Sequence, residues 1–170
     1  SERVMAHIGF DNSPFNIEYF YDGQADKISL LEINTRISQS HSYLFEKVDG
    51  ASNHQVLVEL ALGHRPDFPR NEGKFKYASK FHVRAFEGET ITHAPDEEQL
   101  RKLDEELPEA EVLPEGKAGM KLDDILGKDS YSYRLGVVYL GADDEHELEE
   151  KYRRCLELID YRVDGNKIRI

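Results

Sequence analysis

The sequence is poor in cysteine, in basic residues and in long apolar runs. Its single cysteine, Cys155, excludes an internal disulfide and fits a reducing compartment, so we expect a cytoplasmic protein. No apolar run has the length of a membrane helix and no signal-peptide pattern is present, so no membrane partner is expected. The 22 basic residues face 34 acidic ones, a net charge of -12 that argues against binding nucleic acid, because phosphates would be repelled.

The remaining composition is that of an ordinary folded chain. It has 170 residues, of which 39% are apolar and 33% charged, enough for one domain or two small ones. The acidity does not exclude nucleotide binding, since a metal ion can bridge acidic side chains and phosphates. At the start, Val4 and Ile8 stand four residues apart and Gly9 suits the position after a helix. We therefore expect the last turns of a longer helix, and a fragment of a larger protein.

Strand and helix patterns alternate along the chain and predict an α+β fold, with mostly antiparallel sheet and flanking helices. Residues 38–50 are polar and are expected to be irregular, whereas apolar residues surround most of helix 53–62, which should be well buried. The predicted strands cover 14–22, 28–34, 78–86, 89–93, 109–113, 120–122, 131–140 and 167–170, and the other helices begin near Asp96 and Asp144. The strands 78–86 and 89–93 are expected to be joined at Glu87-Gly88. The predicted domains are 1–64 and 76–170, with a proline-containing linker over 65–75.

The first two strands are expected to pair as an antiparallel hairpin, which brings two acidic residues together. If Glu18 lies opposite Glu32, the two-residue period of a strand places Asn34 on the same face. The same register places Asn16 opposite Asn34 and Phe20 opposite Leu30.

Two opposed carboxylates repel each other, unless a divalent cation lies between them. Oxygen donors from Glu18, Glu32 and Asn34 suit Mg²⁺, which keeps several waters and favours sites completed by phosphates. Arg36 follows at the strand end, where its guanidinium could hold phosphate or carboxylate oxygens. The pattern is equally consistent with an acidic hairpin whose face is simply solvated, so both interpretations stay open.

The motifs of this hairpin resemble a known family. The segments Phe-Asn-Ile-Glu at 15–18 and Leu-Glu-Ile-Asn-Thr-Arg at 31–36 resemble the closing motif of the ATP-grasp superfamily. Gly50, followed by a helix to Leu62-Gly63, is also similar to the family layout. The resemblance is close over 9–63 and looser afterwards, where the chain is similar to the small carboxy-terminal domain that often follows an ATP-grasp module.

The resemblance implies a role for each residue of the motif. Glu18, Glu32 and Asn34 would bind Mg²⁺ on the phosphates of ATP, as metal and cofactor ligands. Arg36 would be catalytic and would contact the reacting phosphate or an acyl phosphate. The implied cofactors are ATP and Mg²⁺ or Mn²⁺.

The implied activity is ATP-dependent ligation of a small-molecule carboxylate to an amine through an acyl phosphate. By this resemblance, residues 1–64 are the carboxy-terminal part of an ATP-grasp domain and 76–170 a small α+β accessory domain. The family's Gly-rich loop and ATP-contacting lysines should lie upstream of Ser1, so this chain alone is expected to be inactive. Nothing in the sequence determines the oligomeric state.

Three alternatives remain open for the function. Biotin carboxylases share a stretch like Asn34-Thr35-Arg36-Ile37, but they place a glutamate where this chain has Ser40 before His41. This difference argues against bicarbonate carboxylation and favours an amino-acid or peptide ligase, while a carbamoyl-phosphate-synthetase-like enzyme remains open. In a non-catalytic alternative, 76–170 is an interaction or lid module. Ser40 and His41 are candidate substrate contacts, or ordinary polar loop residues.

Two further features of the second half have structural explanations. His82 and Arg84 fall on one face of a predicted strand, where we expect surface pairing. Cys155 falls on the apolar stripe of a helix, so we expect a buried structural thiol and no nucleophile.

Overall fold

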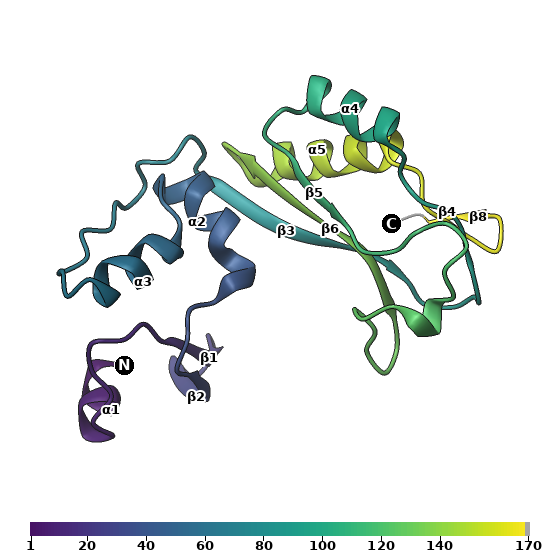
Figure 1. Cartoon of the computed structure of the whole chain (residues 1–170). Helices are drawn as coiled ribbons and strands as arrows, with labels where there is room; N and C mark the ends of the chain where they lie inside the picture. The colour runs from purple at the N-terminus through teal and green to yellow at the C-terminus, as the bar shows by residue number, and fades with distance from the viewer. Residues whose placement is uncertain (169–170) are drawn as a thin grey trace. The chain divides into compact units, whose positions relative to one another are not determined.

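The chain folds into two compact units, Ser1–Gly73 and Lys74–Ile170. A computed structural model describes residues 1–168 (Figure 1). Every strand pair within these residues is antiparallel and helices flank the sheets, which confirms the predicted α+β class. Within the same residues, none of the helices combines the length and the apolar character needed to cross a bilayer.

Unit 1 consists of one hairpin and several short helices. Its elements are α1 (Glu2–His7), β1 (Asn16–Asp22), β2 (Lys27–Asn34), η1 (Gln39–His41), α2 (Ser42–Asp49) and α3 (Asn53–Ala61). The predicted helix end at Gly9 is confirmed, because Gly9 adopts the left-handed conformation with φ +70°. The prediction of an irregular segment over 38–50 is wrong, since it contains η1 and α2. No side chain caps the start of α2, so the sequence carries no start signal there, although Gly50 ends the helix with φ +87°.

Helix α3 lies where the sequence predicted it, but its environment differs. The hydroxyl of Ser52 caps the helix by accepting a hydrogen bond from the backbone N–H of His54, at 3.3 Å. The prediction of a well-buried helix is wrong, because no residue of α3 is buried. Leu57 and Val58 are 41% and 55% exposed, respectively. The apolar surface of α3 is therefore only partly covered.

The segment that follows α3 packs against α2 as part of unit 1. The ring of Phe68 meets Phe45 edge to face, with 5.9 Å between ring centroids. Gly73 lies so close to α2 that a Cβ there would fall 2.4 Å from the carbonyl oxygen of Lys47. The boundary between the units lies within the range 65–75 expected as a linker, but most of that range is attached to unit 1.

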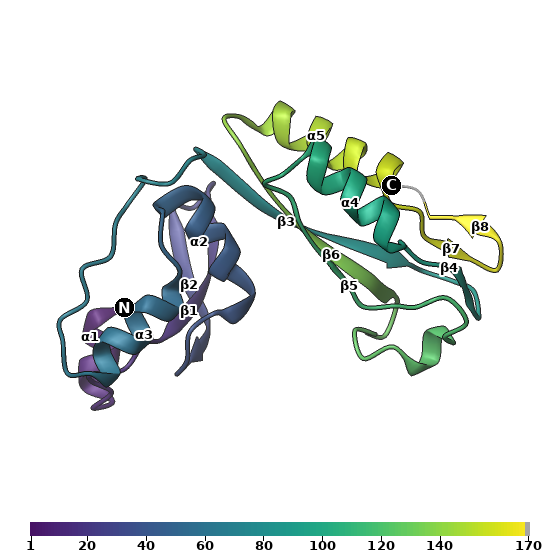
Figure 2. The same ribbon diagram turned by 45° about the horizontal axis from the view of Figure 1, so that its top comes forward.

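Unit 2 contains two three-stranded sheets and two long helices. The strand orders are β3-β6-β5 and β4-β7-β8. Helices α4 and α5 lie side by side on one face of the first sheet (Figure 2). The elements are β3 (Tyr77–Ala85), β4 (Ile91–His93), α4 (Glu97–Glu106), β5 (Glu111–Pro114), η2 (Leu122–Asp124), β6 (Tyr133–Ala142), α5 (Glu145–Leu158), β7 (Arg162–Val163) and β8 (Asn166–Lys167).

The pairing of the shorter strands differs from the expected one. β4 follows β3 closely in sequence, but it pairs with β7 in the second sheet. The predicted strand 120–122 gives way to η2, with a single bridge between Thr90 and Lys121. The predicted last strand begins one residue earlier, as β8, and residues 169–170 lie outside the described part of the chain.

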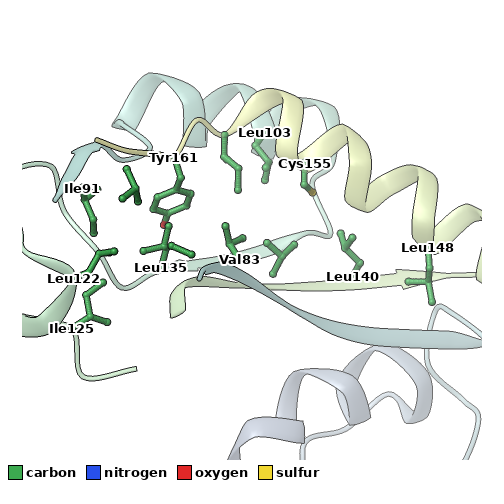
Figure 3. Close-up of a cluster of buried hydrophobic side chains, with 14 of the residues drawn as sticks. Val83, Ile91, Leu103, Leu122, Ile125, Leu135, Leu140, Leu148, Cys155 and Tyr161 are labelled. Carbon is green, nitrogen blue, oxygen red and sulfur yellow. The ribbon is translucent and has the colours of Figure 1, made fainter. Parts of the chain in front are cut away.

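The core of unit 2 fills the space between the first sheet and its two helices (Figure 3). Leu103 of α4 and Cys155 of α5 point toward Val83, Leu135 and Leu140 of the sheet. Leu135 and Cys155 are fully buried, at 0% exposure. The predicted apolar stripe of α5 is confirmed, because its residues at helical spacing face this core.

Candidate functional site

The hairpin of unit 1 brings the predicted ligand residues to one face. In the β1–β2 register, Glu18 lies directly opposite Glu32, and Asn16 lies opposite Asn34. Residues opposite each other on paired strands project from the same face, so this face carries two carboxylates and the Asn34 carboxamide. Both glutamates are exposed, so the face is open to a ligand.

A β-bulge lies immediately beside the two glutamates. The register shifts after Glu18, so that Tyr19 pairs with Leu30 and Leu31 is the extra residue of β2. The predicted pairing of Phe20 with Leu30 is therefore wrong, because Phe20 lies opposite Ser29.

The bulge gives more favourable cross-strand side-chain pairs in the part of the hairpin nearest the turn. It places Ile28 opposite Tyr21, and Lys27 opposite Asp22. Without the shift, Ser29 would lie opposite Tyr21, and the opposite charges would not be paired. Aromatic–aliphatic and oppositely charged cross-strand pairs stabilise a hairpin, which accounts for the extra residue.

Arg36 lies just beyond the end of β2, beside Asn34. Its Nη2 donates a hydrogen bond to the Oδ1 of Asn34 at 3.4 Å, and its Nη1 donates to the carbonyl oxygen of Ile37 at 3.3 Å. These bonds use two of the five N–H donors of the exposed guanidinium. Arg36 is thus a cation close to the carboxylate pair, with donors left for an oxyanion.

The donor set of this face fits a hard divalent cation. Glu18 and Glu32 offer carboxylate oxygens and Asn34 a carboxamide oxygen, the donors that Mg²⁺ prefers. Within residues 1–168, no three His, Cys, Asp or Glu side chains gather as a metal-binding group. The set is thus two carboxylates plus one amide, a composition that suits a metal whose remaining positions are taken by water and phosphate.

Asn53 organises the loop that follows the motif, and the sequence did not indicate this role. Its Nδ2 donates to the carbonyl oxygen of Ser38 at 2.9 Å, and its Oδ1 accepts from the buried Ser42 hydroxyl at 2.7 Å. Ser38 in turn bonds the Nδ1 of His41 at 2.9 Å. The sequence offered only an asparagine at a helix start, a position that favours asparagine as a cap.

The two candidate substrate contacts lie on η1, and both are exposed. A cavity of about 350 Å³ lies beside this loop, lined by the polar residues Ser13, Asn16, Ser38 and Asn53 together with apolar side chains. The described lining includes neither Ser40 nor His41. The substrate role of these two residues stays a prediction.

Comparisons with known proteins find sequence relatives for most of unit 1. Residues 1–67 match the family model described as the carbamoyl-phosphate synthase L chain, ATP binding domain. The carbamoyl phosphate synthase large chains of two Xylella fastidiosa strains are each 32% identical over 72 residues. That match covers 42% of this chain, which spans only 7% of the length of these relatives.

Solved structures share the fold of the chain at low identity. An L-amino acid ligase from Bacillus licheniformis gives a TM-score of 0.65 at 17% identity, covering 94% of this chain and 38% of the ligase. The biotin carboxylase domain of the Hydrogenobacter thermophilus 2-oxoglutarate carboxylase, solved with MgADP, ADP and bicarbonate, gives 0.60 at 17% identity. It covers 98% of this chain and 34% of that domain. Residues 1–67 are therefore similar to part of an ATP-binding domain of the carbamoyl-phosphate synthase type, which supports the resemblance of the hairpin to the ATP-grasp superfamily.

Proposed function

We propose that this chain supplies part of the Mg-ATP site of an ATP-dependent ligase that joins a carboxylate to an amine. The observation that carries the proposal is the opposed pair Glu18 and Glu32, with Asn34 and Arg36 at the strand end. The ATP-binding domain model that matches residues 1–67 supports ATP as the cofactor. The MgADP bound to the Hydrogenobacter thermophilus protein supports the metal.

The side chains of the hairpin would have two roles: some would bind the metal ion, and Arg36 would stabilise negative charge on the phosphoryl group. Glu18, Glu32 and Asn34 would hold Mg²⁺, or Mn²⁺ in its place, through oxygen atoms. When bound, the metal nucleotide would supply a γ-phosphoryl group whose charge the metal partly neutralises. The guanidinium of Arg36 would donate hydrogen bonds to phosphoryl oxygens and so stabilise the charge that shifts during transfer.

The reaction consists of two displacements. A carboxylate oxygen of the first substrate attacks the γ-phosphorus, and ADP leaves with the electrons of the broken P–O bond. The amine of the second substrate attacks the acyl carbon, phosphate leaves, and the amine loses a proton to solvent. Because the solved relatives and the curated ones are much longer, we expect the 170-residue chain alone to show no turnover.

A carbamoyl-phosphate-synthetase-like enzyme is the second candidate, favoured by the family model that matches residues 1–67. A biotin-carboxylase-like enzyme is less well supported, since Ser40 stands where those enzymes place a glutamate. Measuring ADP release with amino acids or with bicarbonate as the acid separates an amino-acid or peptide ligase from the two bicarbonate-using alternatives. A cytoplasmic location, expected from the single cysteine, stays a prediction.

The test uses the complete polypeptide that contains this segment. Glu32→Gln removes one charge of the pair and should lower kcat/KM for ATP at least about 100-fold, because a ligand to the metal is lost. Glu46→Gln, at an exposed position on α2, removes the same charge and should leave activity unchanged. Circular dichroism shows whether each variant keeps the fold.

Two results would contradict the proposal. Full activity in the Glu32→Gln variant would remove Glu32 from the metal site. An ATP turnover that needs no divalent cation in the unchanged enzyme would remove the metal itself. Absence of any ATP-dependent activity in the complete protein would instead favour the non-catalytic alternative.

A further inference from the structure

A second pair of like charges lies across paired strands, in unit 2. Arg84 of β3 lies opposite Arg134 of β6, immediately beside a register shift in which Leu135 is the extra residue. Like charges directly opposite each other destabilise a sheet, and bulges often re-aim side chains at binding sites. The arrangement therefore needs an explanation in terms of what these groups contact.

The two arginines lie on the sheet face that the helices leave uncovered. Phe81 stacks on Tyr152 of α5, with 4.0 Å between ring centroids, so this face of β3 points toward the helices. The alternation of a strand places Lys80, His82 and Arg84 on the opposite face. Neither α4 nor α5 covers that face (Figure 2). Three basic side chains in a row thus lie beside Arg134, in a chain whose net charge is -12.

The carboxylates nearby neutralise only part of this charge. Arg84 forms an ion pair with Asp129 at 2.7 Å, and Arg134 forms one with Glu115 at 2.7 Å. No salt bridge to Lys80 is found among residues 74–168. Burial, together with the charges of Arg134 and Arg84, lowers the pKa of Lys80, although Glu115 acts in the opposite direction. Lys80 thus lies beside two guanidinium groups, and its own charge has no carboxylate partner among these residues.

His82 presents an unmet donor within the same row. Arg84 Nη2 lies 3.2 Å from His82 Nδ1, and a guanidinium can only donate, so Nδ1 accepts and the neutral ring carries its proton on Nε2. That Nε2 is buried and has no hydrogen-bond partner among residues 1–168. Burial, and then the charges of Lys80 and Arg84, lower the pKa of the ring. A buried N–H without an acceptor is unfavourable, and an oxygen atom from a ligand would relieve it.

We propose that this face of unit 2 binds a small oxyanion, a carboxylate or a phosphate, through Lys80, His82 and Arg84. Oxygen atoms of the bound anion would form an ion pair with Lys80 and would accept a hydrogen bond from the Nε2–H of His82. A cavity of about 240 Å³ at the edge of β3 adjoins His82 and Arg84. Its other lining residues are Val83, Phe86, Ile168 and, from α5, Tyr152 and Leu156, and Lys80 does not line it. The cavity leaves room for an apolar substituent on the anion. The site needs neither Mg²⁺ nor ATP, so its test is independent of the proposed ligase activity.

Histidine ring NMR of the 170-residue chain tests this site directly. Inorganic phosphate and succinate are titrated separately near neutral pH, with sodium chloride holding the ionic strength constant and with no nucleotide or metal. We expect a saturable shift of the His82 ring resonance, assigned with a His82→Gln variant, and a rise in the pKa of His82 on binding. The two titrations show whether a phosphate or a carboxylate is preferred.

Lys80→Met should weaken binding at least about 10-fold, since it removes a charge-assisted bond. Lys117→Met, at an exposed lysine of the same unit, removes the same charge and should bind like the unchanged chain. A His82 shift that grows linearly with both anions, or equal weakening in the two variants, would overturn the proposal. If Lys80→Met alters the circular dichroism spectrum, the titration of the unchanged chain alone decides, through saturation or its absence.

Discussion

At the scale of single residues, the face that a side chain occupies on a strand follows from the parity of its position. Glu18 and Glu32 are an even number of residues from Asn16 and Asn34, so any register that pairs the two glutamates gathers all four side chains. Parity alone therefore predicted the composition of the candidate metal face.

The thiol of Cys155 gives a prediction at the same scale. Burial raises its pKa to about 11, and the side chain is fully buried. We expect it to react with a thiol reagent at mildly alkaline pH far more slowly in the folded chain than in denaturant, because the thiolate is the reactive species. Absorbance of the released chromophore measures both rates, and Cys155→Ala should abolish the signal. Equal rates in the two conditions would contradict a buried thiol.

The contacts of Asn53 and His82 show what parity and periodicity leave out. Asn53 forms hydrogen bonds with Ser42, at the start of α2, and with Ser38 of the preceding loop, which lie 11 and 15 positions earlier. Burial lowers the pKa of His82, and so do the charges of Lys80, Arg84 and, from another strand, Arg134. Such roles arise from long-range packing, which single-sequence patterns do not encode.

At the scale of elements, those with local end signals were predicted well. Asp96 caps the start of helix α4. Its Oδ1 accepts a hydrogen bond from the backbone N–H of Gln99 at 2.8 Å, and the Gln99 side chain accepts one from the N–H of Asp96 at 3.3 Å. This capping box satisfies two backbone donors. Helix α2 lacks a side-chain cap and was missed, and the bulge at Leu31 was missed because it depends on competing cross-strand pairs.

The cap of α4 can be tested by substitution. Asp96→Ala should lower the free energy of unfolding by about 1 kcal/mol, since the backbone N–H of Gln99 loses its acceptor. Asp96→Asn keeps an acceptor at the same position and should cost less. Urea unfolding followed by circular dichroism gives both values, and equal losses in the two variants would contradict the capping role.

At the scale of the whole molecule, the two units bury apolar side chains very unequally. Among residues 1–73, Met5 is the one apolar side chain that is buried, whereas unit 2 holds a continuous core around Leu135 and Cys155. The sequence predicted a division into two domains but not this contrast, because apolar periodicity shows which face of an element is apolar and not whether another element covers that face.

The contrast predicts different responses to core truncation. Leu135→Ala should destabilise unit 2 by about 2–5 kcal/mol, through lost burial and a cavity. Val58→Ala, at a half-exposed position of α3, should change stability by less than about 0.5 kcal/mol. We also expect residues 74–170 expressed alone to unfold cooperatively. Similar effects of the two substitutions in urea titrations would contradict this distribution of the core.

The extra residue at Leu31 has a consequence for changes in chain length. If Leu31 were deleted, β1 and β2 could form an uninterrupted ladder with Glu18 still opposite Glu32 and with the same partners toward the turn. The hairpin would then lose its local kink while retaining its pairs. In a homologue that lacks the residue at this position, the two glutamates should stay opposite each other, but their carboxylates should point in a different direction.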